Sequence, residues 1–252
     1  MVIKSSYSEF EGPTPLTIYH LGPDLNLGPL PAYFYFALSG KESLTLDPFN
    51  QPAVYMAEHP VRVFSLTLPG HGEGYTTNTA ISLWANELSS GHNIIQEFIE
   101  NAKETIDYLI DQQVIDPQHL ATAGLSRGGF IATHLAASHE KIGALVGYAP
   151  MTRLTYLQEF EGVRSHSLDL IHLVDKLVNK KVRFYIGNRD VRVGTEESFK
   201  FIEVLTEAGY QAGYRSPSAE LIISPSIGHK GHGTPPHIFR DGVEWIYKQL
   251  EK

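Results

Sequence analysis

Residues 124–128 read GLSRG, with a serine at the centre of the G-x-S-x-G pattern. A serine hydroxyl is a poor nucleophile, and it becomes useful when a sharp strand-to-helix turn lifts it clear of the backbone and a base lies within hydrogen-bond reach. Glycines at such a turn carry no Cβ, so a strand, a helix and a substrate can approach closely. Residues 120–123 predict a strand end and residues 130–137 predict a helix. We therefore expect Ser126 to be a nucleophile at a strand–helix junction.

A serine nucleophile needs a base, and the base needs an acid that holds its tautomer. Asp190 directly follows the predicted strand 181–186 and precedes a predicted helix, which favours it as the acid. The alternative is an ordinary turn residue or an N-terminal helix charge. The loop 225–233, PSIGHKGHG, follows a short predicted strand and holds two histidines among glycines. We predict His229 as the base because it lies closer to the strand end, and His232 is the alternative.

The histidines of this region also raise the question of a metal site. His229, His232 and His237 are separated by three and five residues in a glycine- and proline-rich loop. The loop has no interleaved acidic residue and the chain has no cysteine, so the pattern is weak evidence for metal ligands. The glycine signatures of dinucleotide and P-loop phosphate sites are absent from the sequence. We expect neither a metal nor a cofactor.

Composition places the chain among globular proteins. Its 252 residues are 42% hydrophobic and 19% charged, enough for one sizeable α/β domain over residues 1–252. The net charge of −8 disfavours nucleic acid and anionic membrane surfaces as partners. The chain has no cysteine, no apolar run of the roughly 18 residues that a membrane span needs, and no apolar core of a signal peptide at its start. We expect a soluble, cytoplasmic protein.

Apolar segments alternate with amphipathic ones, which predicts a mostly parallel sheet with helices on both faces. Asp116-Pro117 is expected to break the chain before the strand that leads to Ser126, and residues 151–180 form a short insertion after Pro150. The predicted strands are 16–20 at an edge, 32–38 at the centre, 61–68, 120–123, 141–148, 181–186 and 221–224; the predicted helices are 93–112, 130–137, 196–208 ending at Gly209, and a C-terminal helix with Phe239, Val243, Ile246 and Leu250 on one face.

This order of elements and motifs resembles the α/β-hydrolase family over roughly residues 14–250. The LPGHG sequence at 68–72 looks like a turn that commonly follows an earlier strand in that family. The doubled glycine at the end of GLSRGG is similar to the dienelactone-hydrolase-like and prolyl-oligopeptidase-like branches. The resemblance implies Ser126 as nucleophile, Asp190 as acid and His229 as base, working through an acyl-enzyme.

The intermediate of such a reaction needs two N–H donors for its oxyanion. The first is expected to be the backbone N–H of Arg127, directly after the nucleophile. Family members often carry His-Gly after the predicted central strand, where this chain has LSGK at 38–41. If Ser39-Gly40 replaces His-Gly, the second donor is the N–H of Lys41. The Arg127 side chain has two interpretations: it binds a substrate carboxylate, or it pairs with an acid and shapes the turn.

The short insertion implies a small lid and a modest, fairly open acyl pocket, which favours a carboxylesterase acting on small or medium esters. A peptidase or amidase with the same triad is the alternative, although such peptidases usually carry an extra propeller or cap domain. Perhydrolysis, C–C bond hydrolysis and a non-catalytic binding protein on the same fold are further alternatives. The oligomeric state is left open. Residues proposed to line the pocket, or equally to pack the insertion, are Tyr148, Met151, Leu154, Tyr156 and Leu157.

Overall fold

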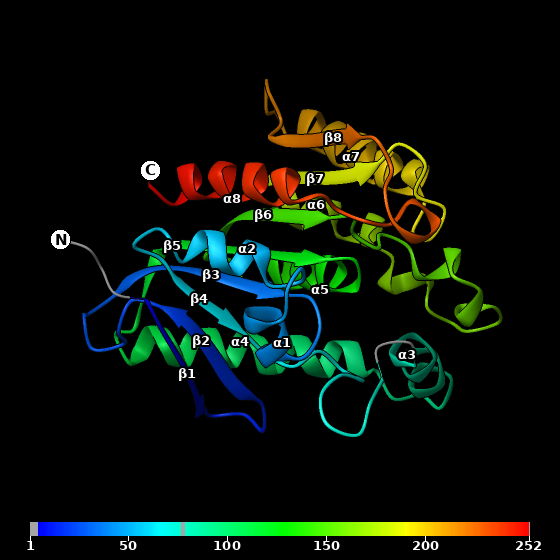
Figure 1. Cartoon of the computed structure of the whole chain (residues 1–252). Helices are drawn as coiled ribbons and strands as arrows, with labels where there is room; N and C mark the ends of the chain where they lie inside the picture. The colour runs from blue at the N-terminus through cyan, green and yellow to red at the C-terminus, as the bar shows by residue number, and fades with distance from the viewer. Residues whose placement is uncertain (1–4, 77–78, 252) are drawn as a thin grey trace.

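The computed structural model describes residues 5–76 and 79–251, and within them eight strands form one sheet with helices on both faces (Figure 1). The spatial order is β1-β2-β4-β3-β5-β6-β7-β8. Strands β3 to β8 run parallel to one another, while β1 and β2 are antiparallel to their neighbours. This is the α/β-hydrolase fold. The strands are β1 Ser6–Glu11, β2 Thr17–Gly22, β3 Leu30–Phe36, β4 Arg62–Ser65, β5 Ile115–Leu125, β6 Ile142–Tyr148, β7 Lys181–Gly187 and β8 Ala219–Ser224.

Strand β3 is central, as its unbroken apolar sequence predicts. It pairs with β4 on one side and β5 on the other, and its residues from Ala32 to Phe36 are at most 1% exposed. Alternate side chains of a strand point to opposite faces. Phe34 and Phe36 accordingly pack toward helix α4 (Ile94–Asp111), and Tyr33 and Tyr35 pack toward helix α8 (Pro236–Leu250). A strand buried on both faces reads as a continuous apolar run.

Helices α4, α5 and α7 cover one face of the sheet, and α2 and α8 cover the other. The predicted apolar face of the C-terminal helix is buried, with Phe239, Val243, Ile246 and Leu250 at most 4% exposed. The helices are α1 Gly40–Thr45, α2 Gln51–Met56, α3 Ala80–Ser89, α4 Ile94–Asp111, α5 Arg127–Ser138, α6 Val174–Leu177, α7 Thr195–Gln211 and α8 Pro236–Leu250; the 3₁₀ turns are η1 Leu154–Tyr156, η2 Gln158–Phe160, η3 His166–Leu168, η4 Leu170–Leu173 and η5 His229–Gly231.

Three local predictions are wrong in their boundaries. The segment 16–20 is part of β2, which is an inner strand because β1 pairs outside it. Asp116-Pro117 lies within the first residues of β5 instead of breaking the chain before it. Helix α7 continues past Gly209, where a Cβ would lie 2.8 Å from the Cβ of Pro217. Gly209 therefore serves a close approach of chain segments and not a helix end.

The insertion after Pro150 consists of 3₁₀ turns η1 to η4 and the short helix α6. Asp169, 1% exposed, accepts hydrogen bonds from the Leu154 N–H at 2.7 Å and the Thr155 hydroxyl at 2.9 Å. His134 of α5 is bonded through Nε2 to the carbonyl of Leu168 at 2.9 Å. The Asp169 contacts join two parts of the insertion, and the His134 contact joins the insertion to the helix that follows Ser126. That residues 1–252 make a single domain stays a prediction.

No helix in the part of the chain that the structure describes has the length and apolarity needed to cross a membrane.

Candidate active site

Ser126 lies at the junction of β5 and α5, as its motif predicts. Its backbone has φ 57° and ψ −116°, a left-handed conformation that is costly for a residue with a side chain. Surrounding hydrogen bonds hold it there: the Ser126 N–H donates to the Tyr148 carbonyl at 2.8 Å, and the Ser126 carbonyl accepts from the N–H groups of Gly129 and Met151, both at 3.0 Å. This backbone conformation places the Ser126 hydroxyl above the carboxyl ends of the strands.

The glycines around Ser126 are required by close backbone packing. A Cβ on Gly124 would lie 2.1 Å from the carbonyl of Gly128, and one on Gly128 would lie 1.9 Å from the carbonyl oxygen of Phe36. The doubled glycine has the same cause, since a Cβ on Gly129 would lie 2.8 Å from the Cβ of Pro150. We call residues 124–129 the elbow.

Asp190 follows β7, and its carboxylate is 2% exposed. Its Oδ1 accepts hydrogen bonds from the N–H groups of Arg192 at 2.9 Å and Val193 at 3.1 Å. Its Oδ2 lies 2.6 Å from His232 Nδ1. One oxygen is thus held by the backbone of its own turn, and the other is aimed at a histidine.

His232 completes a chain of hydrogen bonds, because its Nε2 lies 2.8 Å from the hydroxyl oxygen of Ser126. An ionised carboxylate can only accept, so the proton of the neutral ring is on Nδ1, facing Asp190. Nε2 is then left as the acceptor for the Ser126 hydroxyl proton. Elements 106 residues apart in sequence meet at this point.

The prediction that His229 is the histidine beside Ser126 is wrong, and the alternative His232 occupies that place. The reason is the turn η5, in which the side chain of His229 is exposed. The chain then folds back, and Ile227 pairs with Gly233 across the loop. Proximity to the strand end does not measure distance to Ser126 once such a turn intervenes.

The loop 225–233, here called the base loop, packs directly on residues 188–194, here called the Asp190 loop. Gly231 has φ +75°, and a Cβ on it would lie 2.2 Å from the carbonyl oxygen of Arg189. The Arg189 N–H donates to the hydroxyl of Ser226 at 2.7 Å, and the Ser226 N–H donates to the Asn188 side chain at 3.0 Å. These contacts position His232 against Asp190.

The predicted oxyanion donors have different surroundings. The N–H of Arg127 is at the first position of α5, directly after Ser126. In the loop after β3, the N–H groups of Ser39 and Gly40 already donate to Glu42 at 3.3 Å and to Thr67 at 3.0 Å. Lys41 lines a different cavity from the one that Ser126 lines. Its assignment as second donor stays a prediction.

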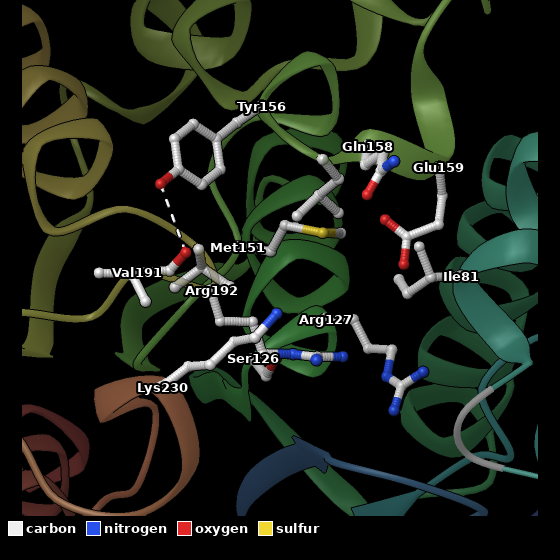
Figure 2. A pocket seen from close by; sticks show the side chains of 12 residues that line it. Ile81, Ser126, Arg127, Met151, Tyr156, Gln158, Glu159, Val191, Arg192 and Lys230 are labelled. Carbon is white, nitrogen blue, oxygen red and sulfur yellow. Dashed lines mark hydrogen bonds between the residues drawn. The ribbon is translucent and has the colours of Figure 1, made fainter.

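Ser126 opens into a cavity of about 430 Å³ that lies between the insertion, the Asp190 loop and the base loop (Figure 2). Three of the proposed pocket residues, Met151, Tyr156 and Leu157, line it. Leu154 and Tyr148 do not, because both are fully buried in the core. The remaining lining residues are Ile81, Arg127, Gln158, Glu159, Val191, Arg192, Val193 and Lys230.

Arg192 and Lys230 are functional candidates that sequence reasoning missed. Both lie two residues from a histidine or aspartate of the hydrogen-bonded chain, which was the available signal. Burial, and then the charge of Arg192, lower the pKa of Arg127 to about 10. Burial and Arg127 lower the pKa of His71 to about 4, so the His71 ring is neutral at pH 7. Arg127 therefore stays charged at pH 7 and contributes a positive charge to the cavity.

No group of three or more His, Cys, Asp or Glu side chains within residues 5–76 and 79–251 is arranged to hold a metal ion.

Comparison with solved structures shows the fold. TT1662 from Thermus thermophilus superposes with a TM-score of 0.75 at 18% identity, covering 99% of this chain and 100% of that one. The esterase Pf2001 of Pyrococcus furiosus gives a TM-score of 0.66 at 13% identity, covering 99% and 92%. Both are similar to this chain over nearly its whole length.

Comparison with sequences identifies the family. The acylamino-acid-releasing enzyme of Arabidopsis thaliana is 23% identical over 150 residues, which cover 49% of this chain and 19% of that enzyme. This chain therefore aligns with only about a fifth of that relative. The family model described as the prolyl oligopeptidase family matches residues 84–252, a segment that contains Ser126, Asp190 and His232. Since the match covers well over half of the sequence, this chain belongs to the prolyl oligopeptidase family.

Proposed function

We propose that this chain is a serine hydrolase, and specifically a carboxylesterase that cleaves small or medium esters through an acyl-enzyme. One observation carries the proposal: Ser126, His232 and Asp190 form a continuous hydrogen-bonded chain of 2.8 and 2.6 Å at a strained strand–helix turn. That arrangement has the geometry and roles of a nucleophile, a base and an orienting acid. The partner is a small-molecule ester.

In the first half-reaction the Ser126 oxygen attacks the ester carbonyl carbon while His232 Nε2 takes the hydroxyl proton. Asp190 stabilises the imidazolium that forms. The tetrahedral intermediate then breaks its bond to the alcohol oxygen, and His232 returns the proton to that oxygen. The alcohol leaves, and the acyl group remains bonded to Ser126.

In the second half-reaction a water molecule gives a proton to His232 and attacks the acyl carbon. The bond to Ser126 breaks, the proton returns to the serine oxygen, and the carboxylic acid is released. The N–H of Arg127, and that of Lys41 as the proposed second donor, stabilise the oxyanion in both steps. Loss of one such donor typically lowers the rate by about a hundred- to a thousand-fold.

The ester assignment is supported by the form of the pocket. The insertion contributes Met151, Tyr156, Leu157, Gln158 and Glu159 to a cavity of about 430 Å³. A cleft of that size accommodates a compact acyl group. Family membership favours a second candidate, a peptidase or amidase, since a relative is an acylamino-acid-releasing enzyme.

The primary test is labelling of the purified protein with a fluorophosphonate, read by intact mass. We expect one adduct on the wild type and none on Ser126→Ala. His229→Ala should label like the wild type, and His232→Ala should label far more slowly. No adduct on a folded wild type would support a non-catalytic binding protein instead.

A matched substrate pair separates the two candidate activities. N-acetyl-alanine is offered as its 4-nitrophenyl ester and as its 4-nitroanilide, which share the acyl group and differ in the scissile bond. An esterase should cleave the ester with little turnover of the anilide. Comparable kcat/KM values for the two would establish the amidase.

A further inference from the structure

The cavity that exposes Ser126 reverses the charge balance of the protein. The chain has 28 acidic and 20 basic residues, yet the cavity is lined by three basic side chains and one acidic one. The basic side chains are those of Arg127, Arg192 and Lys230, and the acid is Glu159. Figure 2 shows Arg192 and Lys230 reaching toward Ser126 from the two adjacent loops, with Arg127 on the other side of the serine.

The backbone holds Arg192 and Lys230 at the cavity. The Arg192 N–H is bonded to Asp190 Oδ1 at 2.9 Å, which anchors the start of its side chain. Lys230 has φ +56°, a left-handed conformation, and its carbonyl accepts a hydrogen bond from the Val191 N–H at 3.1 Å. A non-glycine residue held in this conformation is strained, and such strain concentrates at functional sites.

Arg192 and Lys230 differ in their charged partners from three arginines elsewhere in the chain. Arg153, Arg183 and Arg240 each form an ion pair with a glutamate. Among the described residues, neither Arg192 nor Lys230 forms an ion pair with any carboxylate. Glu159, the acid of the same cavity, forms none with them.

The positive groups also act on one another. Arg192 opposes the protonation of Arg127, which nevertheless stays charged at neutral pH because its pKa is about 10. An anion entering the cavity would relieve this repulsion and would accept hydrogen bonds from Arg192 and Lys230. The guanidinium offers a planar pair of donors that matches a carboxylate, and the ammonium adds a compact charge.

We propose that the substrate of this site is an ester that itself carries a carboxylate or another single negative charge, held by Arg192 and Lys230 next to the reacting carbonyl. The inference rests on the proposed function and narrows it from esters in general to anionic esters. In this proposal, Arg192 and Lys230 select the substrate by its charge, and they lie on the same loops as Asp190 and His232.

The test compares esters that carry a free carboxylate with the same esters in which that carboxylate is methylated and therefore neutral. On the acyl side, mono(4-nitrophenyl) glutarate is paired with 4-nitrophenyl methyl glutarate. On the alcohol side, 4-butyryloxybenzoate is paired with its methyl ester. For the wild type we expect at least one pair to favour the anion by about tenfold in kcat/KM, in line with a hydrogen bond to a charged group. Raising the salt concentration should reduce that preference by screening.

Two variants and one control locate the effect. Arg192→Gln and Lys230→Gln should each lower the ratio of kcat/KM for the anionic ester to kcat/KM for the neutral ester by about three- to tenfold. Arg189→Gln is the matched control, because Arg189 lies in the same loop as Arg192 but does not line the Ser126 cavity. Its preference should equal that of the wild type.

Fluorophosphonate labelling of each protein separates the possible failures. Normal labelling with equal or faster turnover of both neutral esters overturns the anionic-ester inference and leaves the serine hydrolase standing. An anion preference that Arg192→Gln and Lys230→Gln both retain overturns the assignment to these side chains. A folded wild type that does not label overturns both proposals.

Discussion

The elbow around Ser126 and the base loop around His232 meet at one hydrogen bond but are held in different ways. Gly124, Gly128 and Gly129 of the elbow each face atoms of the fold at 1.9 to 2.8 Å from an added Cβ, so its shape is set by the packed core. The base loop lies at the surface, and its shape comes from residues of positive φ, one close approach of Gly231 to the Arg189 carbonyl, and a few hydrogen bonds to the Asp190 loop. A buried turn is specified by sterics, whereas a surface loop is specified by a small number of contacts.

The largest expected effect is a loss of catalysis when the proposed base, His232, is replaced. We expect His232→Ala to lower kcat/KM for a neutral ester by about 10⁴-fold or more, because removal of a triad member leaves only the oxyanion donors and binding. His229→Ala, the matched control in the same loop, should stay within about threefold. Steady-state kinetics on variants with unchanged thermal unfolding provides the measurement. A comparable loss in His229→Ala would show that the loop rearranges when substrate binds.

A glycine substitution in the elbow should mainly lower the free energy of unfolding of the protein. Gly128→Ala places a Cβ 1.9 Å from the Phe36 carbonyl oxygen, and neither backbone can move freely. We expect its free energy of unfolding in urea to fall by about 3 kcal/mol or more. Gly143→Ala in β6 is the control, since its Cβ would meet nothing closer than 4.0 Å. A near-wild-type Gly128→Ala would contradict the claim that packing sets this turn.

The helix behind the elbow adds a pH dependence. Burial lowers the pKa of His134 to about 4, while the unfolded chain keeps the ordinary value of 6.5. Between these values the unfolded state binds one more proton, so the stability is complete above pH 6.5 and is lost as the pH falls toward 4. The expected slope is about 1.4 kcal/mol per pH unit for this histidine.

His134→Gln isolates that contribution, because the amide can still donate to the Leu168 carbonyl but does not titrate. The free energy of unfolding of the variant should vary less steeply between pH 4 and 6.5 than that of the wild type. Equal slopes would mean that His134 is protonated in the folded protein.

The smallest expected effect concerns the contact between the Asp190 loop and the base loop. Ser226→Ala removes the acceptor of the Arg189 N–H, which should cost about 1 kcal/mol in stability and lower kcat a few-fold. Ser216→Ala, at an exposed serine outside both loops, should change neither. An unaltered kcat in Ser226→Ala would indicate that Gly231 packing alone positions His232.

The same contrast explains what the sequence predicts well. The elbow motif, the strands β3, β6 and β7 and the helices α4 and α8 depend on local sterics or on apolar periodicity, and all are confirmed. The short elements β1, α1, α2 and α3 were not predicted. Helix α1 depends on a capping box between Ser39 and Glu42 and spans only six residues, too few for a periodic pattern.

The candidate site was predictable up to the choice of histidine. Both His229 and His232 follow a glycine of positive φ, so local sequence does not distinguish them. The distinction comes from Gly231 lying on the Arg189 carbonyl, a contact between segments about forty residues apart. Arg192 and Lys230 were missed for the same reason, because only the folded loops bring them to one cavity.

The bond between the Val191 N–H and the Lys230 carbonyl joins two loops that each carry one residue of the proposed triad and one basic side chain of the Ser126 cavity. A change in the length of either loop would therefore move a proposed catalytic residue and a proposed charge-selecting side chain together. Side-chain exchange at positions 192 and 230 is expected to change the charge preference without altering the length of either loop. In the insertion, Tyr156 donates to the Val191 carbonyl at 3.5 Å and so also contacts the loop of Asp190, which leaves residues 157–159 as cavity-lining positions where a different loop can be introduced.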